Sequence, residues 1–176
     1  MDYQIFQWLH SLADQHWLTD WLFIFLADYL GYVLLVAAVA LIFWRIKSSR
    51  QRLYYLLLGA LSFLVARGLI VEAVRFFYQR PRPFKVLAFE PLVDQLTSNS
   101  MPSGHAALFF ALAVVTYFID RKYFWYFLLG ALLIAISRVV VGLHWPSDVL
   151  VGALLGTLTA VIIGRFISSP IISSNR

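Results

Sequence analysis

The sequence predicts an all-α bundle that spans a membrane, because its composition is strongly apolar and its apolar residues fall into long runs. The chain has 176 residues, of which 61% are hydrophobic and 13% charged. Soluble domains are about half apolar and a quarter charged, and a chain of this length buries only about 70% of the surface that it exposes when unfolded. A soluble globular protein is therefore excluded. The aromatic content of 17% also excludes a disordered chain.

Five segments predict the spans, because a spanning helix needs about 20 mostly apolar residues. Four of them are Leu53–Tyr78, the shorter His105–Ile119, Tyr123–Leu143 and Val149–Ile167. The fifth lies within Trp21–Trp44, which is interrupted by Asp28 and Gly31, and we place its spanning part at about Tyr29–Trp44. All five belong to one domain of 176 residues.

The N-terminal segment, residues 1–28, alternates large apolar side chains with polar ones. This amphipathic pattern predicts a helix that lies in the membrane interface. The alternative is that Leu18–Asp28 enters the bilayer as a sixth span. The start of the chain has no positively charged region, so we do not expect a cleavable signal peptide.

The bases in the short loops predict the orientation. The loop Arg45–Arg52 holds four bases and no acid, and it falls on the same side as Arg121, Lys122 and the tail bases Arg165 and Arg176. That side is predicted to be cytoplasmic, in a plasma (inner) membrane. The connection Gln79–Pro102 then faces outward although it carries Arg80, Arg82 and Lys85. Bases on the outer side indicate a purpose other than topology, but taken singly Arg80 and Lys85 are interpreted as surface bases at the interface.

The charge and cysteine counts exclude several kinds of chemistry. The net charge is +5, but there is no basic run with interleaved polar surface, so we expect no nucleic-acid partner. The chain has no cysteine, which excludes disulfides and thiolate chemistry and leaves only His and carboxylates to hold zinc. There is also no carboxylate cluster of the kind that binds magnesium, and we expect neither a metal nor another cofactor.

Polar residues from three separate stretches converge on the outer surface in this topology. They are Arg75, Arg80, Arg82, Ser103, His105, Ser137, Arg138, His144 and Asp148. Arginine forks suit phosphate groups, and histidine is a nucleophile or proton carrier near neutral pH. Together these side chains predict a phosphate site.

Local patterns support that site. Ser103 is positioned to cap the helix that follows, and Gly104 would let an anion approach the helix N-terminus. His144 and Asp148 are four residues apart, which suits a contact between imidazole and carboxylate. Alone, Ser103 to His105 could equally be an ordinary helix start, and His144 an interfacial residue beside Trp145.

Together these residues resemble the three-part signature of the type 2 phosphatidic acid phosphatase superfamily. The matching parts are Arg75-x6-Arg82-Pro83, then Pro102-Ser103-Gly104-His105, then Ser137-Arg138-x5-His144-x3-Asp148, within a core of residues 53–167. The order and the spacings agree. One departure is Arg75, where the family usually has lysine, and this puts rate or substrate choice in question because the two cations differ in reach and geometry.

The resemblance implies a metal-independent phosphatase that works through a phosphohistidine. It implies that His144 is the nucleophile, that Asp148 orients it, and that His105 protonates the leaving oxygen and later helps to activate water. Arg75, Arg82 and Arg138, joined by Ser103 and the Gly104 N–H, would bind the phosphoryl oxygens.

A site at the surface of a bundle with almost no soluble part fits a phosphorylated lipid. The opening Met1–Phe6 is similar to bacterial undecaprenyl pyrophosphate phosphatases of bacitracin-resistance type, and this implies release of the monophosphate at the periplasmic or extracellular face. Phosphatidylglycerophosphate, phosphatidic acid and lipid A phosphate are the alternative substrates. A degenerate lipid-binding or flippase-like member is a second hypothesis, which the complete set of His105, His144 and Asp148 argues against. A vanadium haloperoxidase has a similar site, but those enzymes are soluble.

Arg67 and Glu72 fall inside the second predicted span. Five residues apart on an α-helix, they point about 140° apart, which predicts that they do not pair. Glu72 could instead support Arg75, which is one turn further on.

Overall fold

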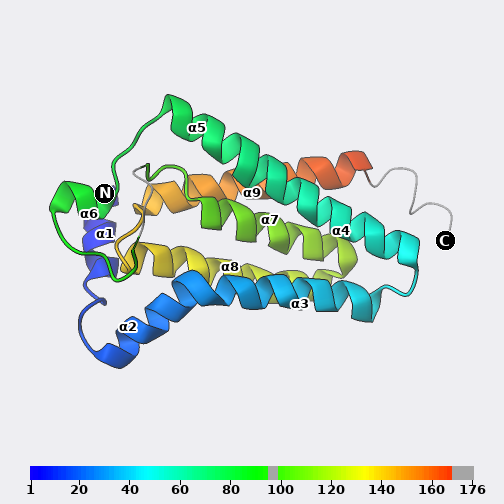
Figure 1. Cartoon of the computed structure of the whole chain (residues 1–176), viewed down its shortest axis with the longest axis horizontal. Helices are drawn as coiled ribbons and strands as arrows, with labels where there is room; N and C mark the ends of the chain where they lie inside the picture. Colours follow the sequence, from blue (N-terminus) through cyan, green and yellow to red (C-terminus); the bar gives the residue numbers. More distant parts are fainter. Residues whose placement is uncertain (95–98, 168–176) are drawn as a thin grey trace.

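The computed structural model describes residues 1–94 and 99–167, and within them regular structure is helical (Figure 1). The α-helices are α1 (Asp2–His10), α2 (Trp17–Ile24), α3 (Leu30–Arg45), α4 (Ser49–Phe63), α5 (Val71–Phe77), α6 (Pro83–Leu87), α7 (Gly104–Ile119), α8 (Arg121–Val140) and α9 (Pro146–Ile167). Two π-helical segments, η1 (Phe25–Tyr29) and η2 (Leu64–Ile70), join α2 to α3 and α4 to α5. Arg176, one of the bases used to predict orientation, lies outside the described residues.

The predicted all-α membrane bundle with five spans is confirmed. Four helices are long and apolar enough to cross a membrane: Trp17–Arg45 and Ser49–Phe77, which each include a π segment, Arg121–Val140 and Pro146–Ile167. The fifth predicted span is the shorter apolar helix α7, of 16 residues. Large apolar side chains on the outside of the bundle, such as Trp44, Phe76 and Phe166, are exposed, as a hydrocarbon environment allows.

The predicted start of the first span at Tyr29 is wrong, because the helix is continuous from Trp17. Asp28 does not interrupt it, since its carboxylate accepts a hydrogen bond from Arg138 Nη1 at 2.7 Å. Leu18–Asp28 belongs to this span and does not form a sixth one. The separate N-terminal helix is only α1, in which Phe6 is buried and Trp8 is exposed.

The expectation that Arg67 and Glu72 do not pair is also wrong. Arg67 Nη1 donates to Glu72 Oε1, because Arg67 lies in η2. A π-helical turn bonds residue i to residue i+5, so side chains five residues apart lie on nearly the same face. Glu72 also accepts from Arg75 Nη1 at 3.2 Å, as the alternative interpretation proposed.

Helix α7 forms the centre of the bundle, packed against α4, α8 and α9. It approaches α9 very closely because α9 presents glycines to it. A Cβ on Gly152 would overlap the Ser103 carbonyl, and one on Gly156 would overlap the Ala107 carbonyl. This packing holds the first turn of α7 beside the first turn of α9.

The chain directions bring three distant segments to one end of the bundle (Figure 1). The starts of α7 and α9, the end of α8 and the connection after α5 all lie at that end, together with α1 and α6. The short turn between α3 and α4 lies at the opposite end. The residues predicted to form the phosphate site come from the first of these two ends.

Gly156→Leu should weaken the bundle, because its side chain would enter the backbone of α7. Overpacking of this kind costs about 1–3 kcal/mol. The measurement is the thermal unfolding midpoint in detergent, with Gly68→Leu as the matched control because a Cβ there has no neighbour within 4 Å. Equal midpoints for the two variants would contradict the close α7–α9 packing.

Candidate active site

A small cavity of about 60 Å³ lies at the end of the bundle where the predicted residues converge. It is lined by Arg67, Arg75, Arg82, Gly104, His105, Arg138 and His144. Six of the eight predicted site residues are in this lining. The remaining two, Ser103 and Asp148, are fully buried and bind the backbone and side chains that form the wall.

The N-terminus of α7 faces this cavity through Gly104. Ser103 caps the helix, since its side chain accepts a hydrogen bond from the Ala106 N–H, and its own N–H donates to the Asp148 carbonyl at 2.9 Å. A Cβ on Gly104 would overlap the Arg67 side chain, so glycine is what allows this close approach. The free N–H groups of a helix N-terminus favour an anion.

His144 is placed by the turn that ends α8. The N–H groups of Leu143 and His144 both donate to the Arg138 carbonyl, and Gly142 takes the left-handed conformation that this turn requires (φ +85°). The helix therefore ends before His144, as the sequence predicted. The His144 side chain is 1% exposed.

Asp148 lies directly behind His144. Its Oδ2 is 3.6 Å from His144 Nδ1, which confirms the predicted imidazole–carboxylate contact. The same oxygen accepts from the Trp145 N–H at 2.8 Å and from Ser100 Oγ. These bonds fix the carboxylate on the Nδ1 side of the ring. The Nε2 atom is on the side of Arg82, which lines the cavity.

Each predicted arginine is anchored from outside the cavity. Arg82 Nη1 donates to the Leu143 carbonyl at 2.8 Å and lies 3.4 Å from His144 Nε2. Arg75 Nη2 donates to the Pro102 carbonyl at 3.1 Å. Arg138 is held by Asp28. Guanidinium groups that are fixed in this way form a preorganised set of donors.

The electrostatics of the cavity favour an anion beside a neutral imidazole. Burial, together with the charges of Arg138 and Arg75, lowers the pKa of Arg82 to about 10 in spite of Asp148, so Arg82 stays charged at neutral pH. Burial lowers the pKa of His144 to about 4, against the opposing hydrogen bond with Asp148 and with the help of the Arg82 and Arg138 charges. His144 is therefore neutral near pH 7, with a lone pair available on one ring nitrogen.

The interpretation of Arg80 as a surface base is wrong. Its Nη1 donates to Asp148 Oδ1 at 2.7 Å, and its Nη2 donates to Asp2 Oδ2 at 2.6 Å. The sequence did contain a signal for this role. Arg80 lies between Arg75 and Arg82, in a connection that carries bases although it is predicted to face outward. Lys85, by contrast, is exposed, as expected of a surface base.

Sequence reasoning also missed Arg67, Asp28 and Ser100. Arg67 was noted as a charge within a span, and such charges commonly mark functional sites. Asp28 carried the same signal, since it lies within the apolar stretch Trp21–Trp44. Nothing local distinguished Ser100, because its partner is distant in the chain. Among the described residues, no group of three or more His, Asp or Glu side chains could hold a metal ion.

The comparison with known families shows which family has this set of cavity residues. The profile of the PAP2 superfamily matches residues 53–169, which include every motif residue of the cavity. This chain belongs to the PAP2 superfamily. Its membership makes it a membrane phosphatase of the lipid phosphatase type.

Individual relatives cover nearly the whole chain. The undecaprenyl-diphosphatase BcrC of Bacillus subtilis is 30% identical over 93% of this chain and 81% of its own length. The bacitracin transport permease protein BcrC of Bacillus licheniformis is 31% identical over 90% of this chain and 76% of its own. The crystal structure of Aquifex aeolicus LpxE aligns with a TM-score of 0.76 and 28% identity, over 93% of this chain and 94% of that one.

Proposed function

We propose that this PAP2 protein dephosphorylates undecaprenyl pyrophosphate to the monophosphate at the outer face of the plasma membrane, through a phosphohistidine and without a metal ion. The observation that carries the proposal is the cavity itself. It is lined by four arginines, the N-terminus of α7 and a neutral histidine that is backed by a buried carboxylate. The similarity to an undecaprenyl-diphosphatase supports the choice of substrate.

In the first step His144 Nε2 attacks the terminal phosphorus in line. The bond from phosphorus to the bridging oxygen breaks, and the leaving undecaprenyl monophosphate takes a proton from His105. Asp148 stabilises the positive charge that His144 acquires. Arg75, Arg82 and Arg138, with the Gly104 N–H, stabilise the negative charge on the equatorial oxygens.

In the second step water replaces the histidine. His105, which has lost its proton, takes one from the attacking water. The new bond from oxygen to phosphorus forms as the bond from phosphorus to Nε2 breaks, and inorganic phosphate leaves. No step needs a metal ion, because the arginines supply the charge that magnesium supplies in other phosphoryl transfers.

His144→Ala should lower phosphate release by at least about 10³-fold, because it removes the attacking atom. Release by the unchanged protein from undecaprenyl pyrophosphate in detergent should persist in EDTA. His16→Ala is the matched control, since His16 is exposed and is not in the cavity lining. An active His144→Ala protein would refute the nucleophile, and loss of activity in EDTA would refute metal independence.

The outward orientation of the cavity rests on the bases of the α3–α4 turn. This turn lies at the opposite end of the bundle from the start of α7 (Figure 1), where Gly104 and His105 line the cavity. Basic short loops stay in the cytoplasm. Arg45 also pairs with Asp120 at that end, at 2.6 Å.

Because the chain has no cysteine, single introduced cysteines can report the topology. In intact cells, Lys85→Cys should react with a membrane-impermeant maleimide, because this exposed residue lies at the cavity end. Lys47→Cys should react only after the cells are permeabilised. The opposite labelling pattern would place the cavity in the cytosol.

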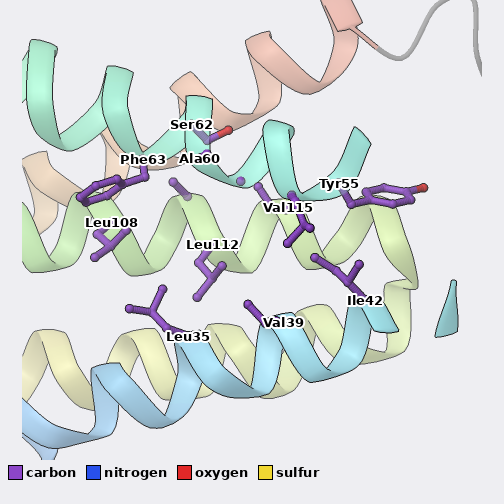
Figure 2. A pocket seen from close by; sticks show the side chains of 13 residues that line it. Leu35, Val39, Ile42, Tyr55, Ala60, Ser62, Phe63, Leu108, Leu112 and Val115 are labelled. Carbon is purple, nitrogen blue, oxygen red and sulfur yellow. The ribbon is translucent and has the colours of Figure 1, made fainter. Parts of the chain in front are cut away.

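An apolar cavity of about 280 Å³ lies between α3, α4 and α7 (Figure 2). It supports a lipid, rather than a soluble phosphate ester, as the substrate. Its lining includes Leu35, Val39, Phe63, Leu108, Leu112 and Val115. On α7 the last three follow His105 by 3, 7 and 10 residues, so they continue its face for about 15 Å. On the facing helix, Phe63 comes one turn before Arg67. A phosphate in the polar cavity would therefore lead a hydrocarbon tail into the apolar one.

Gly59→Leu should fill this apolar cavity, because Gly59 lines it and the nearest atom to an added Cβ is 4.0 Å away. We expect the ratio of kcat/KM for undecaprenyl pyrophosphate to that for isopentenyl pyrophosphate to fall about tenfold, because burying one or two CH₂ groups contributes that much. Gly68→Leu, on the same continuous helix but outside the lining, should leave the ratio unchanged.

The same assay should include phosphatidylglycerophosphate, phosphatidic acid and lipid A. A preference for one of these would replace the proposed substrate and leave the chemistry intact. If Gly59→Leu left the ratio of kcat/KM for the two pyrophosphates unchanged, the lipid tail would not bind in the apolar cavity. Binding of every lipid without phosphate release would favour the flippase-like hypothesis.

A further inference from the structure

A chain of ionic contacts runs from Asp2 in α1 to the carboxylate behind His144. Arg80 bridges two acids, donating from Nη1 to Asp148 Oδ1 at 2.7 Å and from Nη2 to Asp2 Oδ2 at 2.6 Å. Its guanidinium also lies 5.3 Å from the centre of the Trp145 ring. Arg80 is not in the cavity lining, and its guanidinium contacts Asp148, the carboxylate behind His144.

Asp2 makes a second set of contacts to the same region. Its Oδ1 accepts from the Ser147 N–H at 2.9 Å, and its Oδ2 accepts from Ser147 Oγ at 2.6 Å. Ser147 is in the first turn of α9, directly before Asp148. The carboxylate of Asp2 thus binds Arg80, which binds Asp148, and it also binds the backbone of Ser147, the residue directly before Asp148.

The rest of α1 is seated on the same loop. Phe6 is buried, and its ring centre lies 5.1 Å from that of Trp145, the residue whose N–H binds Asp148. His10 Nδ1 is 2.8 Å from the carbonyl of Val140, at the end of α8. Helix α1 therefore contacts the turn that carries His144 on both sides.

We propose that α1 is a positioning element for the site, in which Asp2 holds Arg80 and Arg80 holds Asp148 in the orientation that His144 needs. The proposal rests on the proposed phosphohistidine function. Asp148 has two oxygens to orient. Oδ2 accepts hydrogen bonds from Trp145 and Ser100, whereas Oδ1 accepts one from the charged guanidinium of Arg80. Without Arg80 the carboxylate would be buried with less compensation, and its alignment with the imidazole would loosen.

The ion pair of Asp2 and Arg80 persists at working pH. Burial raises the pKa of Asp2, but its hydrogen bonds with Ser147 and Arg80 outweigh this and hold the pKa below 3.8. Burial lowers the pKa of Arg80, but Asp2 and Asp148 outweigh it and raise the pKa overall. Because the carboxyl pKa is depressed, the contribution of Asp2 is fully present above pH 3.8 and is lost only in more acidic solution.

The test separates positioning from simple stabilisation by measuring kcat and KM for undecaprenyl pyrophosphate in Asp2→Asn, Arg80→Gln and the double variant. We expect Asp2→Asn to lower kcat about tenfold with KM changed less than twofold, because the arginines of the cavity are untouched. In the Arg80→Gln background the same Asp2 substitution should lower kcat less than threefold, because Asp2 acts through Arg80. Asp2→Glu should recover part of the loss, because it restores the carboxylate.

The controls are Asp14→Asn, the same change on the N-terminal segment, and Arg45→Gln, which breaks an ion pair at the other end of the bundle. Both should keep kcat within twofold. An unchanged kcat in Asp2→Asn, a loss confined to KM, or independent losses that multiply in the double variant would each overturn the positioning role.

A second measurement does not depend on turnover. In protein with ¹⁵N-labelled histidine, Asp2→Asn should shift the imidazole signals of His144, whereas Asp14→Asn should not. Unshifted signals would overturn the proposal even if the protein had no phosphatase activity. A complete lack of phosphate release by the unchanged protein would instead refute the proposed function, and the two failures are therefore distinguishable.

Discussion

The carboxylate of Asp148 is the group on which the polar end of this bundle depends. It is 0% exposed, and a buried charge is tolerated only where partners compensate for the lost water. Its partners are the imidazole of His144, the Trp145 N–H, Ser100 and Arg80, which come from two separate connections. Satisfying this one acid therefore draws the connection after α5 and the α8–α9 turn together.

The apolar part of the bundle serves this arrangement by fixing the first turns of α7 and α9 side by side. Glycines on α9 allow the helices to approach until side chains would no longer fit between their backbones. The contact reaches the site directly, because the Ser103 N–H donates to the Asp148 carbonyl. The motif that begins α7 and the motif that begins α9 are thus connected through the backbone, and the phosphate donors and the histidine keep a fixed separation. Preorganisation of this kind is what charge stabilisation in phosphoryl transfer requires.

Sequence patterns predicted the convergence correctly because topology alone brings the motifs to one end. Their failures have specific physical causes. Arg67 and Glu72 were expected to diverge because α-helical geometry was assumed, whereas the chain forms a π-helical segment that brings them together. Asp28 was interpreted as a break in a span, since nothing local shows that Arg138, 110 residues away, accommodates it. Arg80 was interpreted as a surface base because its two acidic partners lie 68 and 78 residues from it.

The sequence by itself determined the membrane environment, the five helical spans and the residue types that gather for phosphate chemistry, since these follow from composition, run length and motif spacing. Only the tertiary structure decided which charges hold other charges in place. Arg82 and Arg80 are two residues apart in the same connection, yet the first lines the cavity and the second binds Asp2 and Asp148 outside it. The reason is that a buried charge needs a compensating partner, and the acids that hold Arg80 and Arg138 are distant in the chain.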